Sequence, residues 1–378
     1  MKKAISFILT VVLVVSVTFT VYAKNDKDDG IKAKSAILMC MDTNEVLYSK
    51  NEKEHLSPAS VTKIMTILLV LEALESHQIT LEDKVSASAN AVSMGGSQIW
   101  LEQGETMTVD ELLRAVVIAS ANDACTALAE YVGGSDSGFV KMMNERAEEL
   151  GCFDTNFENS NGLDDTAKNH YSCAYDLALI SSEVMKHSII ESYTTVWLDS
   201  LRNGDTELNN TNKLINTYDG ITGLKTGTTS NAGFCVSATA RRDGLNLVAV
   251  VLGSDTSEER FEAAALLLDK GFSEYEVINP KLDAEKITPV KVQGGVFKEV
   301  MPKIENKNKF LVKKGSEDIT YKYSVKKSVK APLVKNDTLG VITVMSDKKK
   351  IGEIKLVSPN DISRIQLKSI FRDILIKI

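Results

Sequence analysis

The chain has 378 residues, enough for two domains with hydrophobic cores of their own, and its composition (43% hydrophobic, 25% charged) is that of an ordinary globular protein. Its net charge is −7, and we expect no nucleic-acid partner. Five cysteines without C-x-x-C spacing exclude a fully paired disulfide framework. Four histidines without an H-E-x-x-H or H-x-x-E-H arrangement argue against a zinc peptidase.

The N-terminus has the pattern of a secretory signal peptide. Two lysines precede an apolar run from Ala4 to Val21, which ends in Val-Tyr-Ala before a polar stretch, as at a cleavage site. We therefore predict a signal peptide over residues 1–23 and a linker over residues 24–30. Because the run is long enough to span a bilayer, an uncleaved anchor is the alternative. In both cases the protein is expected to work outside the cytoplasm, at the outer face of the cytoplasmic membrane or in the cell-wall space.

Residues 31–277 are predicted to form one domain with helices between strands. Apolar runs around turn residues predict a hairpin over residues 31–48, and Asp243-Gly244 predicts another between two later apolar runs. A strand is also expected over residues 221–228. Helices are expected after Pro58, after the capping box at Thr108, and over residues 122–134, 137–150, 173–187 and 257–271. This order favours an α+β or α/β domain.

The charge balance changes near residue 278. Residues 1–278 contain 22 Lys and Arg against 40 Asp and Glu, whereas residues 279–358 contain 18 against 9. Such a break is typical of a domain boundary. Short β-prone runs alternate with turns after it, so we predict a small all-β domain over residues 278–358.

The last residues, 359–378, have the pattern of an amphipathic basic helix. From Asp361 on, isoleucines and Phe371 fall roughly on one helical face and basic residues repeat on another. Such a helix is too charged to span a membrane but suited to lie on its surface. A helix that packs on its own domain is the alternative.

Three short patterns occur in order within the first domain. They are S-x-x-K at residues 60–63, S-x-N at residues 120–122 and K-T-G at residues 225–227. Each is weak alone, because S-x-x-K recurs at residues 324–327 and S-x-N at residues 88–90.

Ser60 and Lys63 have the spacing of a nucleophile and its base. Ser60 lies at the start of a predicted helix, where free N–H groups and the helix dipole favour developing negative charge. Lys63 follows about one turn later on the same face. A serine hydroxyl needs an adjacent base, and a lysine can act as one when burial and nearby cations lower its pKa. The alternative is a capping serine beside a solvent-exposed lysine.

The other two patterns offer groups that can bind a peptide. Between two predicted helices, the Ser120 hydroxyl can relay a proton and the Asn122 amide can hold a carbonyl, although simple helix capping is the alternative. Lys225 and Thr226 offer a cation and a hydroxyl to a carboxylate, and Gly227 lets an extended ligand approach the strand edge. Taken alone, this segment could be any strand that leads into a turn.

Together, the three patterns and their spacing resemble the active-site signature of penicillin-recognising serine enzymes. The surrounding sequences narrow the resemblance to the low-molecular-mass D-alanyl-D-alanine carboxypeptidases, across roughly residues 31–277. The sequences that carry it are S-P-A-S-V-T-K-I-M-T, S-A-N-D-A, G-L-K-T-G-T-T, N-S-N-G-L and H-Y-S-C-A-Y-D-L-A. The resemblance implies an α+β (α/β sandwich) catalytic domain, a β-rich second domain and a terminal membrane helix.

The resemblance also implies how acyl transfer would proceed. Lys63 would take the proton of Ser60, and Ser60 would attack the carbonyl between the two terminal D-alanines of a peptidoglycan stem peptide. The N–H groups of Ser60 and Thr228 would form the oxyanion hole. Ser120 would pass a proton to the leaving D-alanine while Asn122 positions the donor chain. No metal or organic cofactor is implied, and β-lactam antibiotics should trap Ser60.

The terminal carboxylate of the substrate would meet Lys225, Thr226 and Thr228. Arg260 matches an arginine that the family places near this carboxylate, although a surface arginine is the alternative there. Cys125, five residues after Ser120, would lie near the cleft, most simply as a buried thiol.

Three other functions fit the same patterns. A class A β-lactamase needs a glutamate that activates the deacylating water, and Glu158, the one nearby candidate, lacks the E-x-x-x-N spacing. A DD-endopeptidase or transpeptidase would use the same residues as a carboxypeptidase. A non-catalytic wall-binding module is the third alternative, and the intact Ser60, Lys63 and Lys225 argue against it.

Overall fold

The computed structural model describes residues 30–164, 167–305, 309–316 and 318–366. The predicted signal peptide, nearly all of the predicted linker and residues 367–378 of the predicted terminal helix lie outside these ranges. Within them, every helix is too short or too polar to cross a bilayer.

The first domain is built on a five-stranded antiparallel sheet with the order β2-β1-β9-β8-β7. The strands are β1 (Ser35–Cys40), β2 (Glu45–Lys50), β7 (Ile221–Thr229), β8 (Gly233–Arg242) and β9 (Leu245–Ser254). Both predicted hairpins are confirmed: β1 pairs with β2, and β8 pairs with β9 across Asp243-Gly244. The first and last strands of the domain therefore lie side by side, and β7 forms one edge of the sheet.

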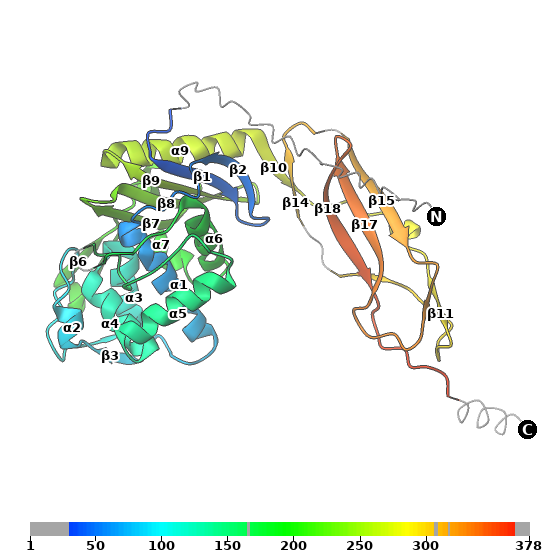
Figure 1. The fold of residues 1–378 in the computed structure, drawn as a ribbon, viewed down its shortest axis with the longest axis horizontal. Coiled ribbons are helices and arrows are strands. Elements are labelled where there is room, and N and C mark those ends of the chain that lie inside the picture. Colours follow the sequence, from blue (N-terminus) through cyan, green and yellow to red (C-terminus); the bar gives the residue numbers. More distant parts are fainter. Residues whose placement is uncertain (1–29, 165–166, 306–308, 317, 367–378) are drawn as a thin grey trace, which may run out of the picture. The chain divides into compact units, whose positions relative to one another are not determined.

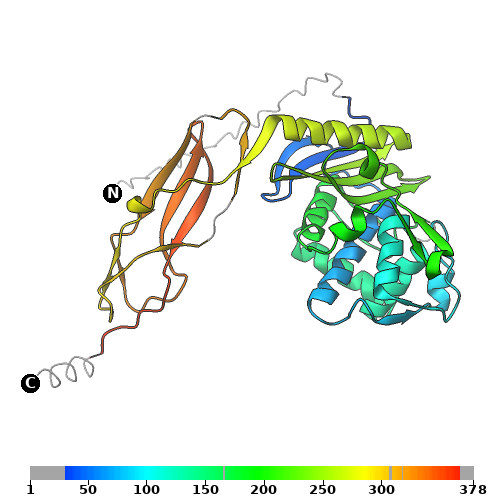
Figure 2. The same ribbon diagram turned by 180° about the vertical axis from the view of Figure 1, so that it is seen from behind.

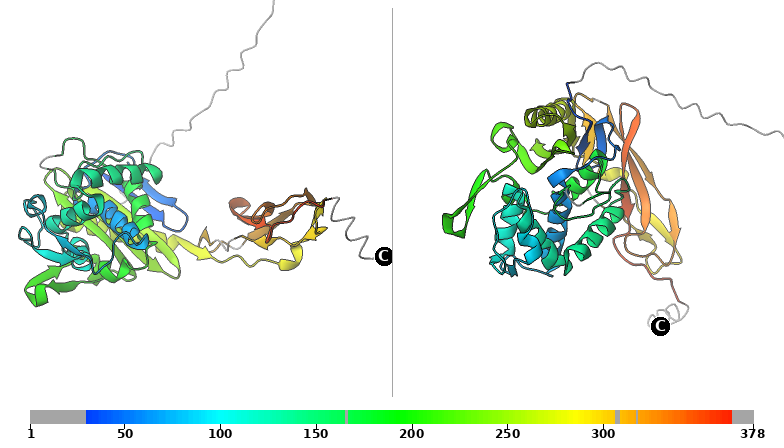
Figure 3. Two further views of the ribbon diagram at one scale, coloured as in Figure 1. Left: turned by 90° about the horizontal axis from the view of Figure 1, so that it is seen from below. Right: turned by 60° about the vertical axis from the view of Figure 1, so that its left-hand side comes forward.

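Helices cover both faces of this sheet, which explains why its central strands are almost wholly apolar. Successive side chains of a strand point to opposite faces. Thus Leu38 of β1 packs with α9 (Ser257–Glu274), whereas Ile37 joins the larger core that holds α1 (Lys63–Glu75) and α6 (Ala174–Val184). Figures 1 and 2 show α9 along one face and α1, α3, α4, α5 and α6 on the other, and Figure 3 shows the same layers from two further directions.

Most of the remaining helices of the domain form a cluster around α1 and α4, whereas Leu214 of α8 joins the core next to α9. Their bounds are α2 (Ala89–Val92), α3 (Val109–Arg114), α4 (Asn122–Gly133), α5 (Asp136–Glu149), α7 (Glu191–Thr194) and α8 (Leu214–Thr217). Two short strand pairs accompany them: β3 (Lys84–Ser86) with β4 (Thr106–Thr108), and β5 (Leu198–Leu201) with β6 (Thr206–Asn209). Helices were predicted at each of the six places named from the sequence, and each is present.

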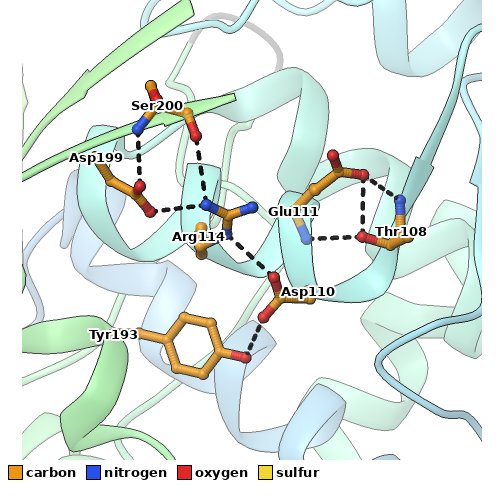
Figure 4. A network of polar contacts seen from close by, with 7 residues as sticks. All are labelled: Thr108, Asp110, Glu111, Arg114, Tyr193, Asp199 and Ser200. Carbon is orange, nitrogen blue, oxygen red and sulfur yellow. Dashed lines mark hydrogen bonds and ion pairs between the residues drawn. The ribbon is translucent and has the colours of Figure 1, made fainter. Parts of the chain in front are cut away.

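Helix α3 is fixed at its start and along one side by polar contacts (Figure 4). The predicted capping box is confirmed, with Thr108 and Glu111 exchanging side-chain and backbone hydrogen bonds. Asp110 accepts from the Tyr193 hydroxyl at 2.7 Å, and Arg114 donates to Asp199 at 2.9 Å. These bonds connect α3 to α7 and β5. They therefore hold in place the helix from which residues 115–119 lead to Ser120.

The second domain is all-β, as predicted. A four-stranded sheet has the order β13-β18-β17-β15, a three-stranded sheet the order β12-β11-β16, and β10 pairs with β14. The strands are β10 (Tyr275–Ile278), β11 (Val290–Gln293), β12 (Glu299–Val300), β13 (Lys303–Ile304), β14 (Phe310–Lys313), β15 (Ile319–Val325), β16 (Ser328–Lys330), β17 (Thr338–Ser346) and β18 (Lys349–Val357). Alternate residues such as Ile342 and Val344 fill one of its two small cores.

The prediction of a terminal helix is wrong for residues 361–366. Residues 361–366 are not helical: Ile362 is buried and pairs with Leu333, and Arg364 pairs with Gly295. Burial of Ile362 between loops of the β domain outweighs the helical spacing of the isoleucines in this part.

Candidate active site

Ser60 lies in a turn of 3-10 helix, Ala59–Thr62, that runs directly into α1. The Nζ atom of Lys63 is 2.8 Å from the Ser60 hydroxyl oxygen. The same Nζ donates to the Asn122 side-chain oxygen at 2.6 Å and to the Asn161 carbonyl at 2.7 Å. Thus the Lys63 amine contacts the Ser60 hydroxyl on one side and is held by the oxygens of Asn122 and Asn161 on the other.

Burial sets the acidity of Lys63. The side chain is completely buried, and this loss of hydration lowers the pKa of Lys63 to about 8, against a smaller opposing effect from Cys125 and Asp123. A considerable fraction of the amine is therefore neutral slightly above neutral pH. A neutral amine in contact with a serine hydroxyl can accept its proton.

Asn122 connects the amine to the opposite wall of the site. It begins α4, next to Ser120, which lies in left-handed conformation (φ +62°) at the end of a π-helical turn over Ala115–Ala119. The side-chain nitrogen of Asn122 donates to the Gly95 carbonyl at 2.7 Å, and the backbone N–H of Asn122 donates to the Ser97 carbonyl at 2.7 Å. The backbone around Ser120 thus changes direction sharply between two helices, which brings Asn122 against Lys63.

Strand β7 passes directly behind residues 59–62, which we call the nucleophile turn after the predicted nucleophile Ser60. Gly227 makes this close approach possible. A Cβ atom on Gly227 would lie 2.7 Å from the Pro58 carbonyl oxygen and 2.9 Å from the backbone nitrogens of Ser60 and Val61. The glycine was predicted to admit a ligand. Its observed effect is to admit the protein's own turn, which places the edge strand beside Ser60.

Lys225 lies on β7 and is almost completely buried. Burial, together with the positive charges of Lys63 and Arg260, lowers the pKa of Lys225 well below its ordinary value. The Thr226 hydroxyl donates to the Thr211 hydroxyl at 2.7 Å. Asn122 of the second pattern thus contacts Lys63 of the first, and Gly227 of the third packs against the turn that holds Ser60.

With this geometry established, the chain can be compared with known proteins. Residues 22–256 match the family model described as D-alanyl-D-alanine carboxypeptidase, and residues 275–364 match the penicillin-binding protein 5 C-terminal domain. The chain belongs to the D-alanyl-D-alanine carboxypeptidase family. It is therefore a serine peptidase with the mixed α/β fold and second β domain of that family.

Individual relatives agree with this assignment. The D-alanyl-D-alanine carboxypeptidase DacF of Bacillus subtilis is 39% identical over 373 residues, 96% of this chain and 95% of DacF. DacD of Escherichia coli is 34% identical over 87% of this chain and 86% of its own length. The structure of penicillin-binding protein 5 from Haemophilus influenzae matches with a TM-score of 0.79 and 28% identity, over 88% of this chain and 98% of that one.

Arg260 is part of the interior of this family member and not a surface residue. It is 7% exposed, and its Nη1 donates to the Gly227 and Cys235 carbonyls and to the Thr228 hydroxyl at 3.0–3.1 Å. Burial lowers the pKa of Arg260 to about 10. Its Nε lies buried without a partner among the described residues. The guanidinium therefore fixes the end of β7 and orients Thr228.

A segment that was given no role from the sequence braces the nucleophile turn; we call residues 158–164 the strap. The Ser160 carbonyl accepts from the Thr66 hydroxyl at 2.6 Å, and the Asp164 carboxylate accepts from the Ser57 hydroxyl at 2.8 Å. A Cβ atom on Gly162, whose φ is +84°, would lie 1.9 Å from the Ala59 carbonyl oxygen. The strap therefore lies against the turn with no space between them.

His170 links the strap to the same turn. Its Nδ1 accepts from the Glu158 N–H at 3.0 Å, so its Nε2 carries the proton and donates to the Thr62 hydroxyl at 2.8 Å. Burial lowers the pKa of His170 to about 4, which keeps the imidazole neutral. The Glu158 carboxylate accepts from the N–H groups of Lys168 and Asn169. The glutamate considered for a β-lactamase role thus has a structural one.

The cysteines give no sign of catalytic chemistry. All five are buried and unpaired. The Cys125 thiol donates to the Ser160 carbonyl at 3.2 Å, and burial raises the pKa of Cys125 to about 11, so it stays a thiol. Within the described ranges, one group has the spacing of metal ligands: Asp154, Cys173 and Asp176. There Asp176 accepts from the Asp154 N–H and the Thr155 hydroxyl, and Cys173 caps α6, so the group already has a structural explanation.

Proposed function

We propose that the protein removes the terminal D-alanine from peptidoglycan stem pentapeptides through an acyl-enzyme on Ser60, which would limit cross-linking of the wall. The contact that supports this most directly is the 2.8 Å separation between Lys63 Nζ and the Ser60 hydroxyl. That contact combines a nucleophile with a base whose pKa lies near the working pH.

Acylation follows from the arrangement of the motif residues. Neutral Lys63 takes the Ser60 proton while the serine oxygen bonds to the carbonyl carbon of the penultimate D-alanine. The negative charge on the carbonyl oxygen is stabilised by the N–H groups of Ser60 and Thr228. The bond to the terminal D-alanine breaks, and its amine receives a proton through the Ser120 hydroxyl. Water then hydrolyses the ester and releases the shortened peptide.

Binding of the substrate would involve both walls of the site. We assign the donor chain to Asn122 and the terminal carboxylate to Lys225, Thr226 and Thr228. Arg260 is a positioning residue in this scheme, because its Nη1 is engaged with β7, β8 and the Thr228 hydroxyl.

We further propose that β-lactams acylate Ser60 and that the enzyme works outside the cytoplasm on the membrane surface. A penicillin-binding protein D2 of Listeria monocytogenes, solved in an ampicillin-bound form, matches with a TM-score of 0.59 and 32% identity, over 64% of this chain and 98% of that one. The location rests on the signal-peptide pattern of residues 1–23 and the amphipathic pattern of residues 367–378.

Intact-mass analysis after penicillin treatment tests the proposal, with D-alanine release from a pentapeptide measured in parallel. Wild type should gain one antibiotic mass and release D-alanine, and Ser60→Ala should do neither. Ser324→Ala alters the serine of the second S-x-x-K pattern, and it should behave as wild type. Cleavage of a cross-linked dimer without D-alanine release would indicate an endopeptidase, rapid antibiotic turnover a β-lactamase, and no adduct a non-catalytic module.

A further inference from the structure

The described part of the β domain exposes five large apolar side chains, one of which is Met301. We call the other four the apolar end: Val296, Phe297, Val334 and Ile365. They are 51%, 64%, 58% and 40% exposed, respectively. Ordinary soluble surfaces carry scattered apolar residues, but a gathered group indicates contact with another apolar phase.

Backbone hydrogen bonds bring together the three chain segments that carry these side chains. The Val296 N–H donates to the Ser363 carbonyl at 3.0 Å, and the Ile365 N–H donates to the Gly294 carbonyl at 2.9 Å. The loop with Val334 joins the same place, because Leu333 pairs with Ile362. The apolar end is therefore built from the turn between β11 and β12, the loop after β16, and the last described residues.

Each of the three segments of the apolar end has a basic residue next to an exposed apolar one in the sequence. Lys298, Lys335 and Arg364 are exposed, and within the described part of the chain no ion pair engages them. Two of the nearby carboxylates are directed at backbone: Asp337 accepts from the Val334 N–H and Asp361 from the Lys335 N–H. Glu299 is the remaining acidic neighbour along the chain. These three acidic residues balance the three basic ones, but the β domain as a whole is positively charged, because residues 279–358 contain 18 Lys and Arg against 9 Asp and Glu.

We propose that the apolar end inserts into the surface of an anionic phospholipid bilayer. Apolar side chains flanked by cations match the boundary between acyl chains and anionic headgroups. The sequence continues from Ile365 into residues 367–378, which contain seven large apolar and three basic residues. The β domain would then supply a second membrane contact beside that segment, and stable attachment generally needs two such signals.

The small number of exposed apolar side chains favours a bilayer over a folded protein as the partner of the apolar end. A stable protein interface buries about 800 Å² on each partner and involves roughly 20–30 residues a side. Four side chains at the ends of three loops are far fewer, whereas a bilayer requires no matching surface. The inference rests on the proposed location outside the cytoplasm, but it is independent of the chemistry at Ser60.

Vesicle co-sedimentation of the full chain tests this inference. The probes are unilamellar vesicles of phosphatidylglycerol with phosphatidylcholine, and of phosphatidylcholine alone. The doubly substituted variant Phe297→Ser, Val334→Ser should bind the anionic vesicles about tenfold more weakly than wild type. Phe153→Ser removes an aromatic residue of the catalytic domain that is 77% exposed, and it should bind as wild type. Lys298→Gln with Lys335→Gln should weaken binding to the anionic vesicles alone.

Each other outcome overturns the inference. Unchanged vesicle binding by the doubly substituted variant would mean that residues outside the apolar end make the contact. Dimers of wild type in the absence of lipid that the substitutions abolish, measured by light scattering, would assign the surface to a second copy. Penicillin acylation and D-alanine release in solution should be equal in wild type and in all these variants. Inactivity of wild type in both assays would count against the proposed enzyme, whereas vesicle binding alone decides the membrane contact.

Discussion

The catalytic centre and the apolar end of the β domain depart from ordinary protein surfaces and interiors in opposite ways. The first buries the side chains of three basic residues, Lys63, Lys225 and Arg260, whereas the second exposes apolar side chains. Neither arrangement is what folding stability alone favours, because buried charge and exposed hydrocarbon both cost free energy. Departures of this kind are concentrated at functional sites.

The two regions differ in how firmly they are held. Around Ser60, hydrogen bonds and close packing from α4, β7 and the strap hold the turn from several sides. At the apolar end, three loops are joined mainly through their backbones, and the side chains point outward. Chemistry requires fixed atoms, whereas insertion into lipid requires only exposed area. Substitutions should therefore be severe in the first region and mild in the second.

The largest effect is expected from Lys63→Arg. The substitution keeps a positive charge but removes a base, because an arginine stays protonated throughout the accessible pH range. Acylation by a labelled penicillin should fall about 1000-fold. Lys327→Arg, in the second S-x-x-K pattern, is the matched control and should leave the rate unchanged. A loss of less than tenfold in Lys63→Arg would show that another group takes the proton.

Gly162→Ala should lower the rate constant of acylation about 100-fold. The new methyl group would collide with the Ala59 carbonyl and come within 2.9 Å of the Thr62 hydroxyl, which displaces the nucleophile turn. Gly134→Ala is the control, because Gly134 has a similar φ of +71° but nothing within 4 Å of its added methyl group. Equal acylation rates in the two variants would mean that the strap does not position Ser60.

The pH dependence of acylation should follow the deprotonation of the Lys63 amine. Since the neutral amine is the active form and its pKa is about 8, the rate constant should rise about tenfold per pH unit below that value and level off above it. Stopped-flow measurements from pH 5.5 to 9.5 would show this. A rate constant that is flat between pH 6 and 9 would contradict a buried lysine base.

The smallest effect is expected from Cys125→Ala. The substitution removes a buried thiol next to the catalytic amine but no group that acts in the proposed chemistry. Stability should fall by about 1 kcal/mol, and acylation should stay within about threefold of wild type. Thermal unfolding and penicillin labelling would measure both. A much larger loss of acylation would give the thiol a part in positioning Lys63.

Much of the site was predictable because its side chains have chemical identities that a sequence displays. Ser60, Lys63 and Asn122 are specific residue types at characteristic spacings, and the structure brings them into contact. The β-rich second domain was equally visible, because its alternating runs and its charge balance differ from those of the first.

The unpredicted parts depend on tertiary contacts. The Asn161 carbonyl holds Lys63, yet every residue type has a carbonyl, so no sequence pattern marks it. The packing of Gly227 against the turn at Ser60 was not predicted either, because the pattern cannot show which chain segment packs against a glycine. Arg260 lies in a helix with charged neighbours, and only the fold shows that it turns inward. The isoleucine spacing after Asp361 predicted a helix, but pairing between loops determines the conformation of residues 361–366.

The low proton affinity of Lys225 has a thermodynamic consequence for ligand binding. In the empty enzyme, burial and then the positive charges of Lys63 and Arg260 lower the pKa of this amine well below its ordinary value. A carboxylate that arrives beside it reverses that balance, so complex formation should absorb a proton from solution. The heat of binding of a carboxylate ligand, measured by titration calorimetry, should then vary with the ionisation enthalpy of the buffer. A heat that is the same in phosphate and Tris would show that the amine is already charged before the ligand arrives.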